Sequence, residues 1–86
     1  MRLQNNIKAR HERAGRAEDA LRVVRRMLLF APGMMELWRE AGVIEARLGN
    51  LAAAIEAFET IVAQADSETA RHDAAMIVQK LRRRLN

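Results

Sequence analysis

The chain has 86 residues, half of them apolar but only three aromatic, and its formal net charge is +4. This length fits one small domain, and the scarcity of aromatic residues and of proline favours packed helices over a sheet. Because cysteine is absent, the sequence excludes a disulfide framework, a thiolate metal site and a thiol nucleophile. The longest apolar run, residues 27–32, is far too short to span a bilayer, and we expect a cytoplasmic protein.

The charge is distributed unevenly along the chain. Residues 1–26 carry a net charge of +5, residues 27–70 carry −5 and residues 71–86 carry +4. Thirteen of the fifteen basic residues are arginine, whose planar guanidinium favours bidentate contacts with carboxylates or phosphates. The basic ends leave nucleic-acid binding as an alternative, but no tyrosine is available for base stacking and the acidic middle would repel phosphates. We expect these charges to lie on solvated helix faces.

The N-terminal part of the chain predicts two helices separated by a turn at Gly15. In the first helix, Leu3, Ile7 and Ala14 fall on one face. A second helix is predicted from about residue 17 to residue 30, with acidic residues in its first turn, where the helix dipole favours them. Its core-facing stripe comprises Ala20, Leu21, Val24, Met27 and Leu28.

Three more helices are predicted after the turn at residues 31–33. The third covers about residues 34–48 and ends at Gly49, and Asn50 is a suitable N-cap for the fourth, over about residues 51–65. Ser67 is a suitable cap for the last helix, whose final turn contains three consecutive arginines that complement the helix dipole. The core-facing stripe of the fourth helix comprises Ala54, Ile55, Phe58, Ile61 and Val62.

Residues 1–34 and 35–68 look like two copies of one unit. At this offset Arg13 matches Arg47, Gly15 matches Gly49, and the two core-facing stripes coincide. A fixed period in this range indicates a solenoid, in which no single unit can bury its own apolar face. The sequence therefore predicts one all-α domain of five antiparallel helices: a pair in 1–34, a pair in 35–68 and a solvating helix in 69–86.

The second copy resembles a tetratricopeptide repeat. The positions at which that family places its aromatic, its close-contact glycine, its turn glycine, its small residue and its second aromatic hold Trp38, Gly42, Gly49, Ala54 and Phe58. Pro32 stands at the family's terminal proline. The copies depart from the pattern at Gln4, Lys8 and His11, at Glu45, where the family usually has tyrosine, and at Asp66, where it has proline. The resemblance implies a superhelical helix stack that acts as a protein-interaction module.

The same resemblance implies where a partner would bind. In this family the first helix of each pair lines a concave face, and here its central position is Ala9, Val43 and Ile77, while Arg13 and Arg47 stack along one rim. Such a groove suits a protein or peptide segment with apolar anchors and acidic residues, the alternative being a merely solvated face. The candidate groove comprises Asn5, Ala9, Glu12, Arg13, Arg39, Val43, Arg47, Asp73, Ile77 and Lys80.

A narrower resemblance concerns the bacterial SirB-type proteins, in which a transglutaminase-like domain precedes a C-terminal repeat region. It is carried by residues 3–8, 28–32, 71–75 and 81–86. The resemblance implies that the chain is a piece of a larger bacterial protein. It also implies an alternative function, in which the repeats are a structural extension that packs on the adjacent transglutaminase-like domain.

The sequence offers no convincing site for catalysis, a metal or a cofactor. His11 and Glu12 resemble the start of a zinc-protease helix, but position 15 is glycine where that motif has its second histidine. The only serine, Ser67, is expected to cap a helix, and no Ser-His-Asp set can be built around it. We therefore expect no enzyme activity, no cofactor and no bound metal.

Overall fold

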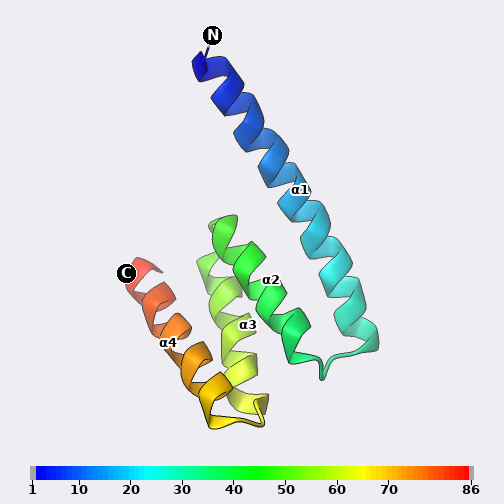
Figure 1. Ribbon diagram of the computed structural model, residues 1–86, viewed down its shortest axis with the longest axis vertical. Helices are drawn as coiled ribbons and strands as arrows, with labels where there is room; N and C mark the ends of the chain where they lie inside the picture. Colours follow the sequence, from blue (N-terminus) through cyan, green and yellow to red (C-terminus); the bar gives the residue numbers. More distant parts are fainter. Residues whose placement is uncertain (1, 86) are drawn as a thin grey trace.

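The computed structural model describes the main chain of residues 2–85 and the side chains of residues 15–85. This part of the chain forms four helices: α1 (Arg2–Phe30), α2 (Met35–Arg47), α3 (Leu51–Gln64) and α4 (Glu68–Leu85). Figure 1 shows them as a stack in which α3 runs antiparallel to α2 and α4, and α1 lies along α2. The expected all-α helix stack is confirmed.

The expected number of five helices is wrong, because residues 2–30 form a single helix with no turn at Gly15. At the equivalent turn, Gly49 has a φ of +84° and is the only glycine with positive φ among the described residues. Gly49 is followed by Asn50, whose type readily starts a new helix, whereas Gly15 is followed by Arg16, which offers no cap. Because Arg16, Ala17 and Glu18 all favour helix, the chain continues through the glycine.

The turn between α2 and α3 is a complete Schellman motif. The amide of Asn50 donates to the carbonyl oxygen of Glu45 at 2.9 Å, and the amide of Gly49 donates to that of Ala46 at 3.1 Å. The motif requires the left-handed backbone conformation at residue 49, and glycine adopts this conformation without strain. The side chain of Asn50 makes no cap bond to α3 and instead donates to the Glu45 carboxylate at 3.0 Å.

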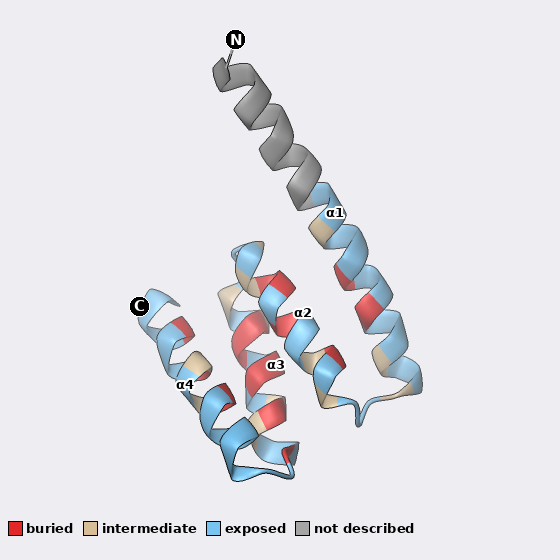
Figure 2. Cartoon of the chain, in the orientation of Figure 1, coloured by how far each residue is buried: buried red, intermediate tan, exposed pale blue. Residues whose placement is uncertain are grey.

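Two apolar clusters hold the stack together. One lies between α3 and α4 and contains Phe58, Val78 and Leu81, with Trp38 of α2 packed against it. The other joins α1 to α2 through Leu21, Val24 and Ile44. On α1 the buried residues lie on the side that faces α2, as Figure 2 shows. The indole Nε1 of Trp38 also donates to the carbonyl oxygen of Pro32 at 2.8 Å, which fixes the α1–α2 turn.

A nearly buried carboxylate adds a polar link between α1 and α2. Glu45 is the only buried charged residue among the described side chains. Its Oε2 accepts from Nη2 of Arg25 at 2.7 Å, and its Oε1 accepts from Nδ2 of Asn50 at 3.0 Å. Both oxygens are therefore paired, which is what keeps a buried carboxylate tolerable.

Removing the arginine should expose the cost of this buried charge. We expect Arg25→Ala to lower the free energy of unfolding by about 1–2 kcal/mol, since Oε2 of Glu45 would lose its partner while Arg25 itself is largely exposed. Chemical denaturation followed by circular dichroism measures this loss. The double variant Arg25→Ala with Glu45→Met should recover most of it, because an apolar side chain of similar size needs no partner. No recovery would show that Arg25 stabilises the stack in another way.

Candidate functional site

A hollow opens between α2 and α4, over the surface of α3. It has a volume of about 310 Å³ and is mainly apolar at its base, where Phe58 and Ile61 of α3 lie. Helix α2 contributes Met35, Glu36 and Arg39, while the far wall is made by the start of α4 with Ser67, Thr69, Ala70, Asp73, Ala74 and Ile77. The hollow is therefore open to solvent on the side away from α3.

A second hollow of about 390 Å³ continues along the same two helices. Its walls are Val43, Ala46 and Arg47 of α2 and Ile77, Leu81 and Arg84 of α4, and Phe58 again lies at the base. Phe58 and Ile77 line both hollows, so the two adjoin along the same pair of helices. We call the two adjoining hollows together the α2–α4 groove.

The two ends of the groove differ in charge. The end near the start of α2 and α4 carries Glu36, Arg39 and Asp73, which mix both signs. The other end carries Arg47 and Arg84 and no acidic residue among its lining side chains. The middle is apolar, with Val43 and Ile77 facing each other over the base. A ligand would therefore meet an apolar centre and one basic end.

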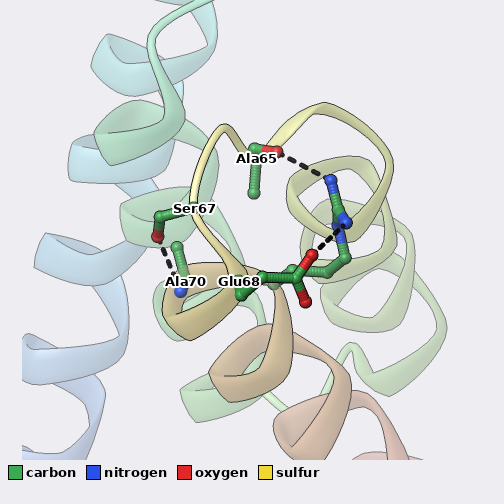
Figure 3. Close-up of polar contacts among 5 residues, drawn as sticks. Ala65, Ser67, Glu68 and Ala70 are labelled. Carbon is green, nitrogen blue, oxygen red and sulfur yellow. Dashed lines mark hydrogen bonds and ion pairs between the residues drawn. The ribbon is translucent and has the colours of Figure 1, made fainter.

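The position of α4, which forms one wall, is fixed by polar contacts at its start. Figure 3 shows Ser67 turned toward Ala70, whose amide donates to the Ser67 hydroxyl oxygen at 3.0 Å. This is the expected N-cap. Arg71 donates to the carbonyl oxygen of Ala65 at 3.0 Å and to the Glu68 carboxylate at 3.1 Å, which closes the α3–α4 turn.

The base of the groove depends on a close approach of α2 to α3 at Gly42. A Cβ atom built on Gly42 would lie 2.6 Å from Cε2 of Phe58 and 2.9 Å from Cδ2. Only a residue without a side chain fits there. The ring of Phe58 consequently lies directly against the α2 backbone and forms the base of the groove there.

The residues predicted for the groove fall into three sets. Arg39, Val43, Arg47, Asp73 and Ile77 all line the α2–α4 groove. Lys80 lies exposed on α4 and lines neither hollow. The remaining four, Asn5, Ala9, Glu12 and Arg13, lie outside the residues whose side chains the structure describes.

Several groove residues were not predicted from the sequence, above all Phe58, Ile61 and Arg84. Phe58 and Ile61 belong to a stripe that was assigned to the core, and both are indeed buried. Nothing in the sequence indicated that they also line the groove. Arg84 was assigned to helix-dipole compensation. A spacing signal was available, because Asp73, Ile77, Leu81 and Arg84 follow one another at intervals of four, four and three on one face of α4.

Within the described residues no group of three or more histidine, aspartate or glutamate side chains could hold a metal ion. No helix in this part of the chain is long and apolar enough to cross a membrane.

The stacked antiparallel helices and their open groove define the chain as an α-helical repeat protein. The model of the tetratricopeptide repeat family matches residues 7–86, and the chain belongs to this family. No curated protein and no solved structure matches it. The resemblance seen in the sequence is thereby confirmed at the level of the family, and membership indicates an interaction module with protein or peptide partners.

Proposed function

We propose that the chain binds a segment of another protein in the α2–α4 groove. The observation that carries this proposal is that two hollows adjoin along α2 and α4 and share Phe58 and Ile77, an elongated surface that suits one extended or helical segment. The binding is passive: preformed helices present an apolar centre between charged rims. Affinity comes from apolar burial, and the arginines set the register of the segment.

The chemistry of the groove specifies the partner segment further. Apolar side chains of the segment would lie over Val43 and Ile77, and acidic residues would lie at the end lined by Arg47 and Arg84. Arginine favours carboxylates in particular, because its planar guanidinium forms two parallel hydrogen bonds with them. We therefore propose an apolar segment with acidic residues at one end as the ligand class.

Selection of random peptides displayed on phage against the isolated chain tests this proposal. Peptides that bind should be enriched in apolar and acidic residues. We expect the double variant Val43→Asp with Arg47→Glu to weaken their binding by about a hundredfold or more, since it places negative charge in both the apolar centre and the basic end. Circular dichroism should show unchanged helicity, because Val43 and Arg47 are both exposed.

A matched control is available on another face of the stack. The double variant Val23→Asp with Arg26→Glu makes the same pair of replacements on α1, outside the groove, and should leave peptide affinity unchanged. Peptides in which lysine replaces the acidic residues should regain affinity for the groove variant. Equal binding of the selected peptides to the wild-type chain and the groove variant would rule out the α2–α4 groove as the binding site.

The setting of the module forms a second part of the proposal. The resemblance of residues 3–8, 28–32, 71–75 and 81–86 to SirB-type proteins supports a larger bacterial protein with a transglutaminase-like domain before these repeats. In that setting the repeats could instead be a structural extension of the preceding domain. Reading the coding sequence upstream of Met1 tests this part, since an in-frame transglutaminase-like domain is expected there.

A further inference from the structure

Helix α1 carries an apolar stripe that is left exposed by the residues whose side chains the structure describes. It consists of Ala20, Val23, Met27 and Phe30, and we call it the α1 stripe. The side chains are well exposed, Val23 to 57%, Met27 to 48% and Phe30 to 90%. The stripe lies about a third of a turn around the helix from Leu21, Val24 and Leu28, which pack on α2.

Two positions of the stripe are covered in the second copy of the internal repeat. At an offset of 34 residues, Ala20 and Met27 of α1 correspond to Ala54 and Ile61 of α3. Ala54 and Ile61 are fully or almost fully buried in the cluster that α3 forms with its neighbouring helices. The residue types are similar, and the difference is that α3 packs extensively on both α2 and α4, whereas in the described part of the chain α1 packs extensively only on α2. By analogy with α3, a helix is the element that would cover the α1 stripe.

The two ends of the stack differ in whether they have the polar outer surface that the end of a solenoid needs. Terminal helices of a repeat stack need a polar outer surface to stay soluble. Helix α4 meets this need, because its exposed residues are mostly polar or charged. Helix α1 does not, because its exposed surface includes the α1 stripe. An apolar surface of this kind marks an interaction site.

We propose that a second copy of this chain covers the α1 stripe, with the two α1 helices packed antiparallel. The stripe has intervals of three, four and three residues, which is the spacing of a coiled-coil seam. An antiparallel pair centred between Val23 and Met27 places Ala20 opposite Phe30 of the second copy and Val23 opposite Met27 of the second copy. Each layer thus combines a small and a large side chain, which is how facing helices fill space.

Charges beside the stripe favour the same arrangement. Asp19 and Arg26 lie on one flank of the α1 stripe, seven residues apart, and both are exposed. In an antiparallel pair the same flank of each helix lies beside that of the other, and the two chains run in opposite directions. Asp19 of one copy is then offset by about five residues, or about 7.5 Å, from Arg26 of the other, a distance that a long arginine side chain can span. In a parallel pair the equivalent flanks of the two helices would lie on opposite sides of the seam, so that Asp19 of one copy could not reach Arg26 of the other.

Sedimentation equilibrium over a series of protein concentrations tests the proposal. We expect the wild-type chain to approach twice the monomer mass. The variant Val23→Lys should raise the dissociation constant at least tenfold, because each copy would bury a charge in the seam. Lysine favours helix more than valine does, so a loss of association would not reflect unfolding. The control Leu29→Lys changes an apolar residue on another face of α1 that is even more exposed than Val23, and it should leave the dissociation constant within about twofold.

Cysteine cross-linking tests the direction of the pair, and the chain contains no cysteine of its own. A mixture of the single variants Val23→Cys and Met27→Cys should form a mixed disulfide faster than either variant forms a disulfide with itself. Faster self-linking of each variant would show a parallel pair and overturn the proposed arrangement. A wild-type chain that stays monomeric at every concentration, or a dimer that Val23→Lys does not weaken, would overturn the second copy as the occupant.

The proposal does not depend on the α2–α4 groove. The groove variant Val43→Asp with Arg47→Glu should keep the dimer, and the α1 variant Val23→Asp with Arg26→Glu should lose it while still binding peptide. Each surface can therefore fail its test without affecting the other.

Discussion

Replacing Phe58 by alanine is expected to lower the free energy of unfolding by about 3–5 kcal/mol. The ring is only 2% exposed, lies against the α2 backbone at Gly42 and forms the base of both hollows of the groove. Removing it leaves a cavity between three helices that cannot collapse without moving α2. Small domains are stable by only about 5–15 kcal/mol, so this one replacement should remove a large part of the stability. Denaturant unfolding followed by circular dichroism measures the change.

The chain's other phenylalanine provides the control. Phe30 is 90% exposed at the end of α1, and Phe30→Ala removes the same atoms without opening a cavity. We expect it to change the free energy of unfolding by less than about 0.5 kcal/mol, measured at a dilution at which the chain is monomeric. Similar losses for the two variants would contradict the position of Phe58 at the centre of the stack.

Alanine at Gly42 and alanine at Gly15 are expected to have opposite effects on stability. At Gly42 the new Cβ would lie within 3 Å of the buried Phe58 ring, and the overpacking should cost about 1–3 kcal/mol, more than the helix propensity gained. At Gly15 no atom lies within 4 Å of the new Cβ, and the glycine stands inside a continuous helix. There alanine should stabilise the chain by about 0.5–1 kcal/mol.

The Gly15 variant also tests the architecture. If a turn with a left-handed glycine existed at this position, as it does at Gly49, alanine would be strained and would destabilise the chain. Thermal and denaturant unfolding of Gly15→Ala, Gly42→Ala and Gly49→Ala therefore compare a helical, a closely packed and a left-handed glycine. A destabilising Gly15→Ala would be evidence against the continuous α1.

A dimer formed through α1 would have consequences for binding in the groove. It would carry two α2–α4 grooves, one on each copy, and a partner with two acidic apolar segments could occupy both. Linking two binding events in this way raises the overall affinity without any new contact. We expect a tandem peptide to bind the wild-type chain more tightly than a single peptide. The advantage should disappear in the Val23→Lys variant.

Much of the fold follows from the sequence alone. The spacing of apolar residues predicts α2, α3 and α4 nearly to their ends, because in this chain the pattern is regular and each helix has a clear stop or start. Gly49 and Ser67 act through contacts within a few residues, a left-handed turn and a cap bond, so that local sequence suffices. The resemblance to tetratricopeptide repeats likewise implies one wall of the groove, with Arg39, Val43 and Arg47, which share a face of α2 because they are four residues apart.

The rest was decided by tertiary structure. Gly15 and Gly49 occupy the same place in the repeat, yet only Gly49 ends a helix, and there α3 folds back to pack on α2. Phe58 and Arg84 become groove residues only when α4 lies beside α2, a relation between residues far apart in the chain. Glu45 is tolerated in the interior because Arg25, twenty residues earlier, reaches its carboxylate. Met27 and Ile61 have similar side chains at equivalent positions, yet Met27 is exposed and Ile61 is buried. Burial therefore depends on the neighbouring helices rather than on the residue itself.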